Sequence, residues 1–329
     1  MFRFNRRDTC LRVRAHIESR MILLFRSSFA SAARWTEELH KHLPDLEVRV
    51  FPEIGNVREI DAALVWKPPP GLLASLPNLR MIATLGAGVD FLYDDPSLPR
   101  GVPIVRLIDP YMTEAMSEYV LTQVLRLHRR DLTYAAQQRE RAWREHHQPN
   151  AAERRVGILG LGELGGDAAR KLAVMGFQVA GWSRRERRLP GIATFHGQDG
   201  LAALARHSEI LVCLLPLTPE TEGVLNAGFF AEMPKGAAIV NVARGGHLVE
   251  EDLIPALESG QLSAAVLDVF REEPLPAAHP FWTHPRIIVT PHVAAATHAP
   301  TAAVGVADNL KRLAEGRPLL NVVDPTLRY

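Results

Sequence analysis

Polar side chains follow three of the apolar runs in the second half of the chain. Arg244 comes directly after NVA, Glu272 and Glu273 follow DVFR, and His292 follows IVTP. An arginine can bind an anion, and a histidine beside a carboxylate can exchange a proton. Because the carboxyl ends of parallel strands meet at one edge of an open sheet, we expect Arg244, a glutamate and His292 to lie together. Each residue alone is usually solvated or structural, so the prediction depends on all three following strands of one domain.

A glycine-rich turn precedes these residues. The apolar run VGIL breaks into Gly160, Gly162 and Gly165, spaced G-x-G-x-x-G, and the following ELGGDAARKLAVMG is typical of a helix. The first glycine permits the tight turn, the second lets backbone N–H groups approach a pyrophosphate, and the third lets the helix pack on the strand. The helix N-terminus adds partial positive charge. This context favours a dinucleotide site over an ordinary strand–helix turn.

The end of the next strand distinguishes between the two nicotinamide cofactors. An NAD-binding fold usually carries a carboxylate there, which hydrogen-bonds the adenosine ribose. This chain has Ser183, Arg184 and Arg185 at that point and no carboxylate before Glu186. A hydroxyl beside two guanidinium groups suits a 2′-phosphate, although a solvated basic turn is the alternative. The sequence therefore predicts NADP(H) as the preferred cofactor and NAD(H) as the second choice.

Short apolar runs alternate with helical patterns from Met21 onward, and these elements must position the polar groups. The strand-like runs cover 21–25, 46–50, 62–66, 80–86 and 102–106, and then 155–160, 177–182, 209–215, 237–243, 264–270 and 286–290. A long helix is predicted between the two series, beginning with Asp109 as N-cap and Pro110 as first helical residue, and a last helix covers about 297–316. The pattern predicts an α/β fold with two Rossmann-like domains and doubly wound parallel sheets.

Composition excludes several classes of protein. The 329 residues are 47% hydrophobic and 23% charged with a net charge of +1, so bulk charge predicts no binding to nucleic acid or to an anionic membrane. The two cysteines, Cys10 and Cys213, form no disulfide framework and no Cys/His spacing is typical of a metal site. No apolar run is long enough to span a bilayer. We expect a cytoplasmic protein without a metal ion.

The first twenty residues differ from the rest. MFRFNRRDTCLRVRAHIESR carries six arginines and no apolar segment of a secretory signal. Asp8, Glu18 and the scarcity of serine disfavour a mitochondrial presequence. We interpret residues 1–20 as a disordered N-terminal extension upstream of the true start, and a basic arm that binds nucleic acid is the alternative.

Eight motifs occur in the order found in one enzyme family. They are LGAGVD (85–90), MSEYVLTQVL (116–125), GILGLGELG (157–165), GWSRR (181–185), LLPLTPET (214–221), NVARGGHLVEEDL (241–253), LDVFREEPLP (267–276) and TPHVAA (290–295). On these motifs the chain resembles the D-isomer-specific 2-hydroxyacid dehydrogenase family, and within it the glyoxylate/hydroxypyruvate reductase A branch. The resemblance implies NADPH-dependent reduction of small 2-ketoacids, from glyoxylate to glycolate and from hydroxypyruvate to D-glycerate.

The resemblance also implies roles for the residues at the strand ends. His292 is similar to the family's general acid, which gives a proton to the keto oxygen as hydride arrives at the carbon. Glu273 is similar to the carboxylate that pairs with this histidine and favours the imidazolium. Arg244 is similar to the residue that binds the substrate carboxylate through forked hydrogen bonds.

Further substrate-binding residues are implied in the first half and in the connector. The backbone N–H groups of Ala87, Gly88 and Val89 match the family's carboxylate-binding loop, which without the resemblance would be a plain turn. Trp66 would line the pocket, with core packing as an equal alternative. Trp143 matches a tryptophan that closes the neighbour's pocket across the dimer of related reductases, so a homodimer is expected.

The family motifs also imply a cofactor-binding set and a domain layout. The set is Met116, Gly160, Gly162, Glu163, Leu164, Gly165, Ser183, Arg184, Arg185, Leu215, Pro216, Thr221, Val242, Ala243, Asp268, His292 and Ala294. A cofactor domain, 116–294, is inserted into a discontinuous substrate domain, 21–115 and 295–329. Two other functions stay open: another D-2-hydroxyacid dehydrogenase, of the D-lactate or phosphoglycerate type, and a non-enzymatic NAD(P)-sensing protein of the corepressor type.

Overall fold

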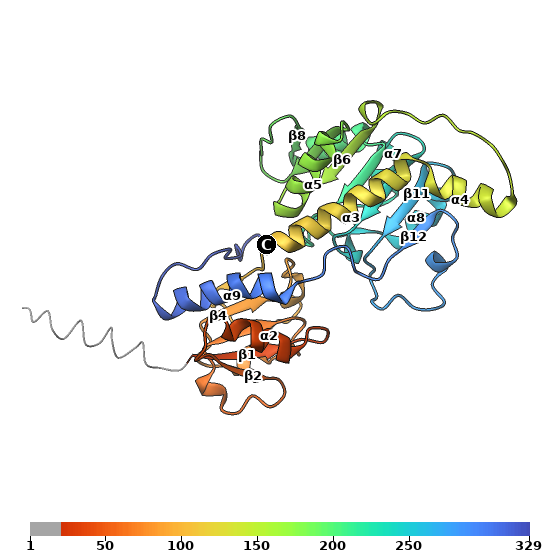
Figure 1. Cartoon of the computed structure of the whole chain (residues 1–329). Coiled ribbons are helices and arrows are strands. Elements are labelled where there is room, and N and C mark those ends of the chain that lie inside the picture. Colours follow the sequence, from red (N-terminus) through yellow and green to blue (C-terminus); the bar gives the residue numbers. More distant parts are fainter. Residues whose placement is uncertain (1–20) are drawn as a thin grey trace, which may run out of the picture. The chain divides into compact units, whose positions relative to one another are not determined.

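The computed structural model describes residues 21–329, which divide into two compact units. Unit 1 comprises the described chain up to Tyr111 together with Thr297–Tyr329, and unit 2 comprises Met112–Ala296 (Figure 1). The sequence predicts domain boundaries at 115/116 and 294/295, and this division lies at 111/112 and 296/297. The N-terminal extension predicted for 1–20 lies outside the described residues.

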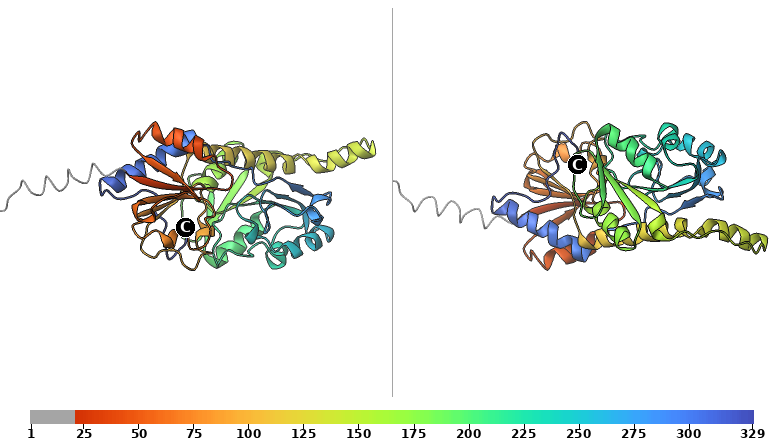
Figure 2. Two further views of the ribbon diagram at one scale, coloured as in Figure 1. Left: turned by 90° about the horizontal axis from the view of Figure 1, so that it is seen from below. Right: turned by 90° about the horizontal axis from the view of Figure 1, so that it is seen from above.

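Unit 1 contains a parallel five-stranded sheet. In sheet order, its strands are β2 (Glu47–Val50), β1 (Ile22–Arg26), β3 (Ala62–Val65), β4 (Met81–Thr84) and β5 (Ile104–Val105). Every residue of β3 and β4 is buried, as expected for parallel strands covered on both faces. The helices α2 (Ala32–His40) and α9 (Ala299–Ala314) pack side by side (Figure 2). Single helical turns are η1 (Val57–Glu59), η2 (Leu73–Ser75) and η3 (Asp90–Leu92).

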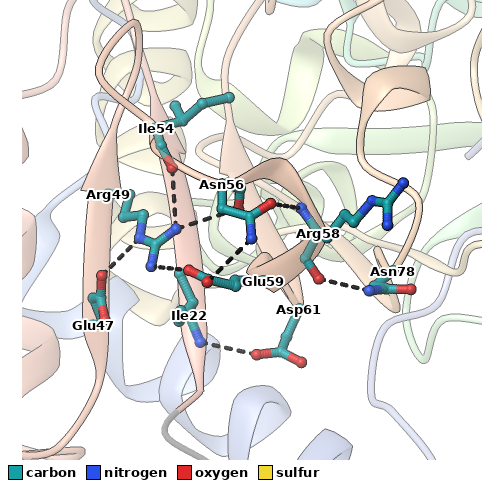
Figure 3. Close-up of polar contacts among 9 residues, drawn as sticks. All are labelled: Ile22, Glu47, Arg49, Ile54, Asn56, Arg58, Glu59, Asp61 and Asn78. Carbon is teal, nitrogen blue, oxygen red and sulfur yellow. Dashed lines mark hydrogen bonds and ion pairs between the residues drawn. The ribbon is translucent and has the colours of Figure 1, made fainter.

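Arg49 stabilises the loop that follows the edge strand β2. The Arg49 guanidinium pairs with Glu47 at 2.6 Å and with Glu59 at 2.6 Å, and it donates to the carbonyl oxygens of Ile54 and Asn56 (Figure 3). The two carboxylates raise the pKa of Arg49 above its ordinary value. These contacts give Arg49, Glu47 and Glu59 a structural task in holding the loop.

Unit 2 contains a parallel seven-stranded sheet. In sheet order, its strands are β12 (Ile287–Val289), β11 (Leu262–Leu267), β10 (Ala237–Asn241), β9 (Ile210–Cys213), β6 (Arg155–Leu159), β7 (Gln178–Ser183) and β8 (Ala193–His196). Its helices are α3 (Pro110–His128), which starts in unit 1, α4 (Asp131–Glu140), α5 (Glu163–Val174), α6 (Gly197–His207), α7 (Ala227–Glu232) and α8 (Glu250–Glu258), with η4 (Ala151–Glu153), η5 (Gly245–His247) and η6 (Pro280–Trp282). The chain order reverses at β6, between β9 and β7, and ligands of open α/β sheets bind outside such a point.

Both faces of this sheet are apolar, because successive residues of a strand point to opposite sides. Ile239 packs with Phe230 in the cluster on one face, whereas the next residue, Val240, packs with Leu172 in the cluster on the other. The sheet is therefore the middle layer of a three-layer α/β unit, and the α/β fold with parallel sheets predicted from the sequence is confirmed.

Two features were not predicted. The long helix begins at Pro110 as predicted, and it ends at His128 because Arg130 adopts a left-handed φ of 60° before a separate helix, α4, begins. A single left-handed residue leaves no mark on the apolar pattern around it. The strand β8 was not predicted, since its four partly exposed residues at the sheet edge form no apolar run.

Candidate active site

The glycine-rich turn joins β6 to α5 at the reversal point of the unit 2 sheet. Gly160 has a φ of 99°, and a Cβ there would lie 2.7 Å from the Leu214 carbonyl oxygen. A Cβ on Gly165 would lie 1.8 Å from the carbonyl oxygen of Gly160, so both glycines are needed for the turn itself. Gly162, the N-cap of α5, is different, because a Cβ there would meet no atom within 4 Å. The open side of this turn therefore leaves room for a ligand at the helix N-terminus.

The basic segment after β7 reaches the same turn. β7 pairs with β6 and ends at Ser183, whose hydroxyl donates to the carbonyl oxygen of Arg185 at 2.7 Å. Arg187 donates a hydrogen bond to the carbonyl oxygen of Leu161, between the first two glycines. Sequence reasoning missed Arg187, although RRERR places four arginines within reach of the predicted phosphate. This guanidinium brings positive charge onto the turn.

His292 and Glu273 form a hydrogen-bonded pair after neighbouring strands β12 and β11. Nδ1 of His292 lies 2.9 Å from Oε2 of Glu273, and the other carboxylate oxygen accepts from the backbone N–H of Phe270 at 3.1 Å. An ionised carboxylate only accepts, so Nδ1 carries the proton of this bond and Nε2 is the nitrogen that can exchange a proton with a substrate. The ring is 40% exposed, which gives a small molecule access to it.

The backbone around His292 is held in an unusual conformation by Asp268. His292 has a φ of 54°, which a residue other than glycine seldom adopts. Its N–H donates to the Asp268 carbonyl oxygen at 2.8 Å, and the Asp268 carboxylate accepts from the N–H groups of Val293 and Ala294, each at 2.9 Å. Asp268 is 1% exposed and Ala294 is also buried. Both residues were predicted to bind cofactor, and here they shape the loop that carries the histidine.

Arg244 lies at the start of η5, just after β10. Its guanidinium donates to the carbonyl oxygen of Ala243 at 2.6 Å, and its backbone N–H lies 3.2 Å from Nδ1 of His247. His247 is completely buried, and its Nε2 lies 3.2 Å from the carbonyl oxygen of Pro216. This histidine, which sequence reasoning missed, therefore connects the arginine loop with the loop after β9. Its position three residues after Arg244 was the only signal in the sequence.

The arginine loop and the glutamate loop are in direct backbone contact. A Cβ on Gly245 would lie 1.9 Å from the carbonyl carbon of Phe270, three residues before Glu273. Since β10, β11 and β12 are parallel neighbours, the chain segments that follow them emerge at one edge of the sheet. The structure therefore brings the loops of the three predicted catalytic residues together, with Glu273 and His292 in contact.

The remaining residues of the predicted cofactor set lie on α3, in the first turn of α5 and in the loops after β9 and β10. Thr221 closes the loop after β9 by donating to the carbonyl oxygen of Pro216 at 2.7 Å and accepting from the N–H of Thr218 at 2.9 Å. The apolar members of the set are mostly buried: Met116 on α3, Leu215, Val242 and Ala243. Glu163 and Leu164 form the first turn of α5.

In unit 1, the loop 85–90 offers unused backbone donors. Among the described residues, no hydrogen bond occupies the N–H groups of Ala87, Gly88 and Val89, and backbone donors without a protein partner can bind an anion. Trp66 packs on this loop, because a Cβ on Gly86 would lie 2.8 Å from its ring. The same ring contacts Phe91, with centroids 4.8 Å apart. Trp66 thus supports the loop through packing.

Trp143 has little contact with the rest of the described chain. It lies in the segment that leaves α4 and returns in a long arc to η4 (Figure 1). Its side chain is 96% exposed.

Within residues 21–329, no group of three or more His, Cys, Asp or Glu could hold a metal ion, and none of the helices there is long and apolar enough to cross a membrane.

Comparisons with known proteins point to one family. The family model described as D-isomer specific 2-hydroxyacid dehydrogenase, NAD binding domain, matches residues 121–294. Glyoxylate/hydroxypyruvate reductase A of Serratia proteamaculans is 44% identical over 317 residues, which cover 94% of this chain and 100% of the relative. The enzyme of the same name from Yersinia enterocolitica is 42% identical, with the same coverage.

Two solved structures are similar along nearly the whole chain. A D-isomer specific 2-hydroxyacid dehydrogenase from Xanthobacter autotrophicus Py2, in complex with NADPH and MES, has a TM-score of 0.90 and 44% identity, covering 94% of this chain and 99% of that one. An NADPH-dependent glyoxylate/hydroxypyruvate reductase from Sinorhizobium meliloti, in complex with NADP and sulfate, has a TM-score of 0.88 and 40% identity, covering 94% and 100%.

Proposed function

Because the chain belongs to the D-isomer-specific 2-hydroxyacid dehydrogenase family, we propose that it reduces glyoxylate to glycolate and hydroxypyruvate to D-glycerate with NADPH. The observation that carries this proposal is the His292–Glu273 pair, 2.9 Å apart and open to solvent, in the unit that also holds the glycine-rich turn. The activities named for the relatives support the choice of substrates.

The residues of unit 2 fit a dinucleotide. The open space over Gly162 and the N-terminus of α5 suit a pyrophosphate, and Ser183, Arg184, Arg185 and Arg187 suit a 2′-phosphate. When bound, NADPH supplies the hydride. The arginine-rich segment in place of a carboxylate supports NADPH over NADH, in agreement with the cofactors of the two similar structures.

His292 and Glu273 divide the proton chemistry between them. In its protonated form, His292 gives the Nε2 proton to the keto oxygen as the hydride adds to the carbon, so the C=O group becomes CH–OH. Glu273 holds Nδ1–H throughout, which directs Nε2 away from the carboxylate and stabilises the imidazolium by its negative charge. The histidine must then take up a proton before the next turnover.

Arg244 is the proposed partner of the substrate carboxylate. A guanidinium can make two parallel hydrogen bonds to a carboxylate, which selects acids with the carboxylate next to the carbonyl. The unused N–H groups of Ala87, Gly88 and Val89 are further proposed carboxylate donors. Trp66, which packs on this loop, is a further proposed substrate contact.

We further propose a cytoplasmic homodimer in which Trp143 contacts the second copy. An indole that is 96% exposed is costly in water and suits an interface. Complete burial raises the pKa of the Cys213 thiol to about 12 and leaves it unreactive.

The decisive experiment is the initial rate of nicotinamide oxidation by the purified protein. Glyoxylate, hydroxypyruvate and pyruvate are each tested with NADPH and NADH, beside a His292→Ala variant. We expect turnover of the first two with NADPH and its collapse in the variant. A preference for pyruvate would indicate a D-lactate dehydrogenase, and a preference for NADH would contradict the role of the arginines. Cofactor binding without turnover would favour a sensor.

A further inference from the structure

A chain of three side chains connects helix α3 with the loop that carries His292. The hydroxyl of Tyr119, on α3, lies 2.5 Å from Oγ1 of Thr290, and Thr290 lies 2.6 Å from Oδ1 of Asp268. All three residues belong to unit 2 and none is a member of the His292–Glu273 pair. Neither Tyr119 nor Thr290 has a task in the function proposed above.

The direction of these hydrogen bonds follows from the chemistry of their ends. An ionised Asp268 only accepts, so the Thr290 hydroxyl donates to it and must accept from Tyr119. Burial raises the pKa of Tyr119 to about 12, which keeps its proton in place at every working pH. The chain therefore has one polarity, from Tyr119 through Thr290 to Asp268.

Asp268 transmits this connection to the backbone of the histidine. Its two carboxylate oxygens accept from the N–H groups of Val293 and Ala294, while its own carbonyl oxygen accepts from the N–H of His292. Glu273, by contrast, contacts His292 at its ring. Asp268 thus fixes the backbone at His292, which has a φ of 54°, through its carbonyl oxygen and its carboxylate, whereas the Glu273 carboxylate binds the ring. A conformation of this kind persists only where its surroundings determine it.

We infer that Tyr119 and Thr290 are positioning residues for the general acid. Their hydroxyl groups orient the Asp268 carboxylate, which holds residues 292–294 in the conformation that aims the His292 ring. We call Tyr119, Thr290 and Asp268 the relay. The inference rests on the proposed function, because it assigns the relay a task in the proton transfer by His292. A mere structural tie between α3 and the loop would stabilise the fold but leave the kinetics of the folded enzyme unchanged.

Four variants test the relay by steady-state kinetics with glyoxylate and NADPH. Tyr119→Phe and Thr290→Val each remove a hydroxyl at nearly constant volume, and we expect kcat to fall by about 5- to 30-fold, with KM for glyoxylate changing by less than about 2-fold. Thr290→Ser keeps the hydroxyl and should restore most of kcat. Because the two hydroxyls act in series, Tyr119→Phe/Thr290→Val should lose no more than Thr290→Val alone.

Tyr93→Phe is the matched control, since burial raises the pKa of Tyr93 too but its hydroxyl has no hydrogen-bond partner among the described residues. It should keep wild-type kcat. Wild-type kcat in folded Tyr119→Phe and Thr290→Val, or losses that add up in the double variant, would overturn the inference.

A second measurement does not depend on turnover. In protein labelled with ¹⁵N-histidine, the Nδ1–H resonance of His292 is assigned by its loss in His292→Gln. Hydrogen bonding to Glu273 should place it far downfield in the wild type, and it should move or broaden in Tyr119→Phe and Thr290→Val but not in Tyr93→Phe. An inactive wild type would refute the proposed function, while this resonance, unchanged in both variants, would refute the relay.

Discussion

At the scale of single residues, the direction of the His292 ring results from two carboxylates with different tasks. Glu273 binds Nδ1, and Asp268 binds the surrounding backbone. Glu272, the neighbour of Glu273, has no role in this arrangement. The sequence offers both glutamates after the same strand, and only the family resemblance favours the second. The structure distinguishes them by a hydrogen bond.

Glu273→Gln tests the charge of this carboxylate. The amide keeps the shape and can still accept from Nδ1–H, but it no longer stabilises an imidazolium, so we expect kcat for glyoxylate to fall by about 10²-fold or more. Glu272→Gln, on the next residue, is the matched control and should keep wild-type kcat. Equal losses in the two variants would show that the effect comes from the loop and not from the pair.

The residues that sequence reasoning missed share a physical cause. His247 touches Pro216, 31 positions away in the chain, and Arg187 touches Leu161, 26 positions away. Such contacts arise from the order of the strands in the sheet, which the spacing of residues does not encode. The positions of Gly160, Arg244 and His292 at a turn or a strand end were predictable, because each residue directly follows an apolar run in the sequence.

At the scale of elements, the segment after strand β7 and the turn after β6 are the proposed determinants of cofactor choice. The arginines after β7 belong to one short segment but differ in their surroundings. Arg187 reaches the glycine-rich turn, whereas Arg188 is 90% exposed and pairs with Glu186. Their contributions to binding a 2′-phosphate should differ accordingly.

Arg187→Ala should therefore raise KM for NADPH by about 10-fold and leave KM for NADH within about 2-fold, since a charge-assisted contact to a phosphate is lost only with NADPH. Arg184→Ala, at the predicted position, should act in the same direction. Arg188→Ala is the control and should change neither value. A parallel rise for both cofactors in Arg187→Ala would indicate a damaged turn.

The C-terminal end of α3 carries a group that links stability to pH. Burial, together with Arg154 and Arg129, lowers the pKa of His128 below its ordinary value, and the ring packs edge-on against Phe177 at 5.1 Å. Below about pH 6.5 the unfolded chain takes up a proton that the folded chain resists. The contribution of this histidine to stability is thus present above that pH and lost as the pH falls.

Thermal unfolding at pH 7.5 and 5.5 measures this effect. We expect the Tm of the wild type to fall between the two values, and a smaller fall in His128→Gln, in which the titrating ring is absent. His196→Gln, at an exposed position, should behave as the wild type. An equal fall in all three proteins would assign the pH dependence to other groups.

At the scale of the whole molecule, the presence of strands was predicted best from the sequence, and the ends of helices and strands were predicted least well. The eleven strand-like runs from 21–25 to 286–290 each overlap a strand of the structure, because most of these parallel strands are buried on both faces and are therefore continuous apolar segments. The break at Arg130 and the edge strand β8 escaped prediction for the opposite reason, since neither alters the apolar pattern.

The proposed homodimer makes a prediction about Trp143. Trp143→Ala should raise KM for glyoxylate by about 5-fold or more and leave KM for NADPH unchanged, because an aromatic side chain that closes a pocket is lost. Light scattering on the same samples reports whether the variant is still a dimer. Val174→Ala, at another exposed apolar position, is the control. An unchanged KM in Trp143→Ala would refute the substrate contact.

The contact of Gly245 with Phe270 restricts how this enzyme can be re-engineered. Since a side chain at position 245 would meet the Phe270 backbone, a loop without glycine there cannot be introduced unless the segment around Phe270 changes with it. A chimera that takes 241–247 from a relative but keeps 268–276 of this chain would bring together two backbone segments from different proteins at this close contact. Libraries aimed at new 2-ketoacids should therefore vary the two segments as one cassette, with position 245 held constant.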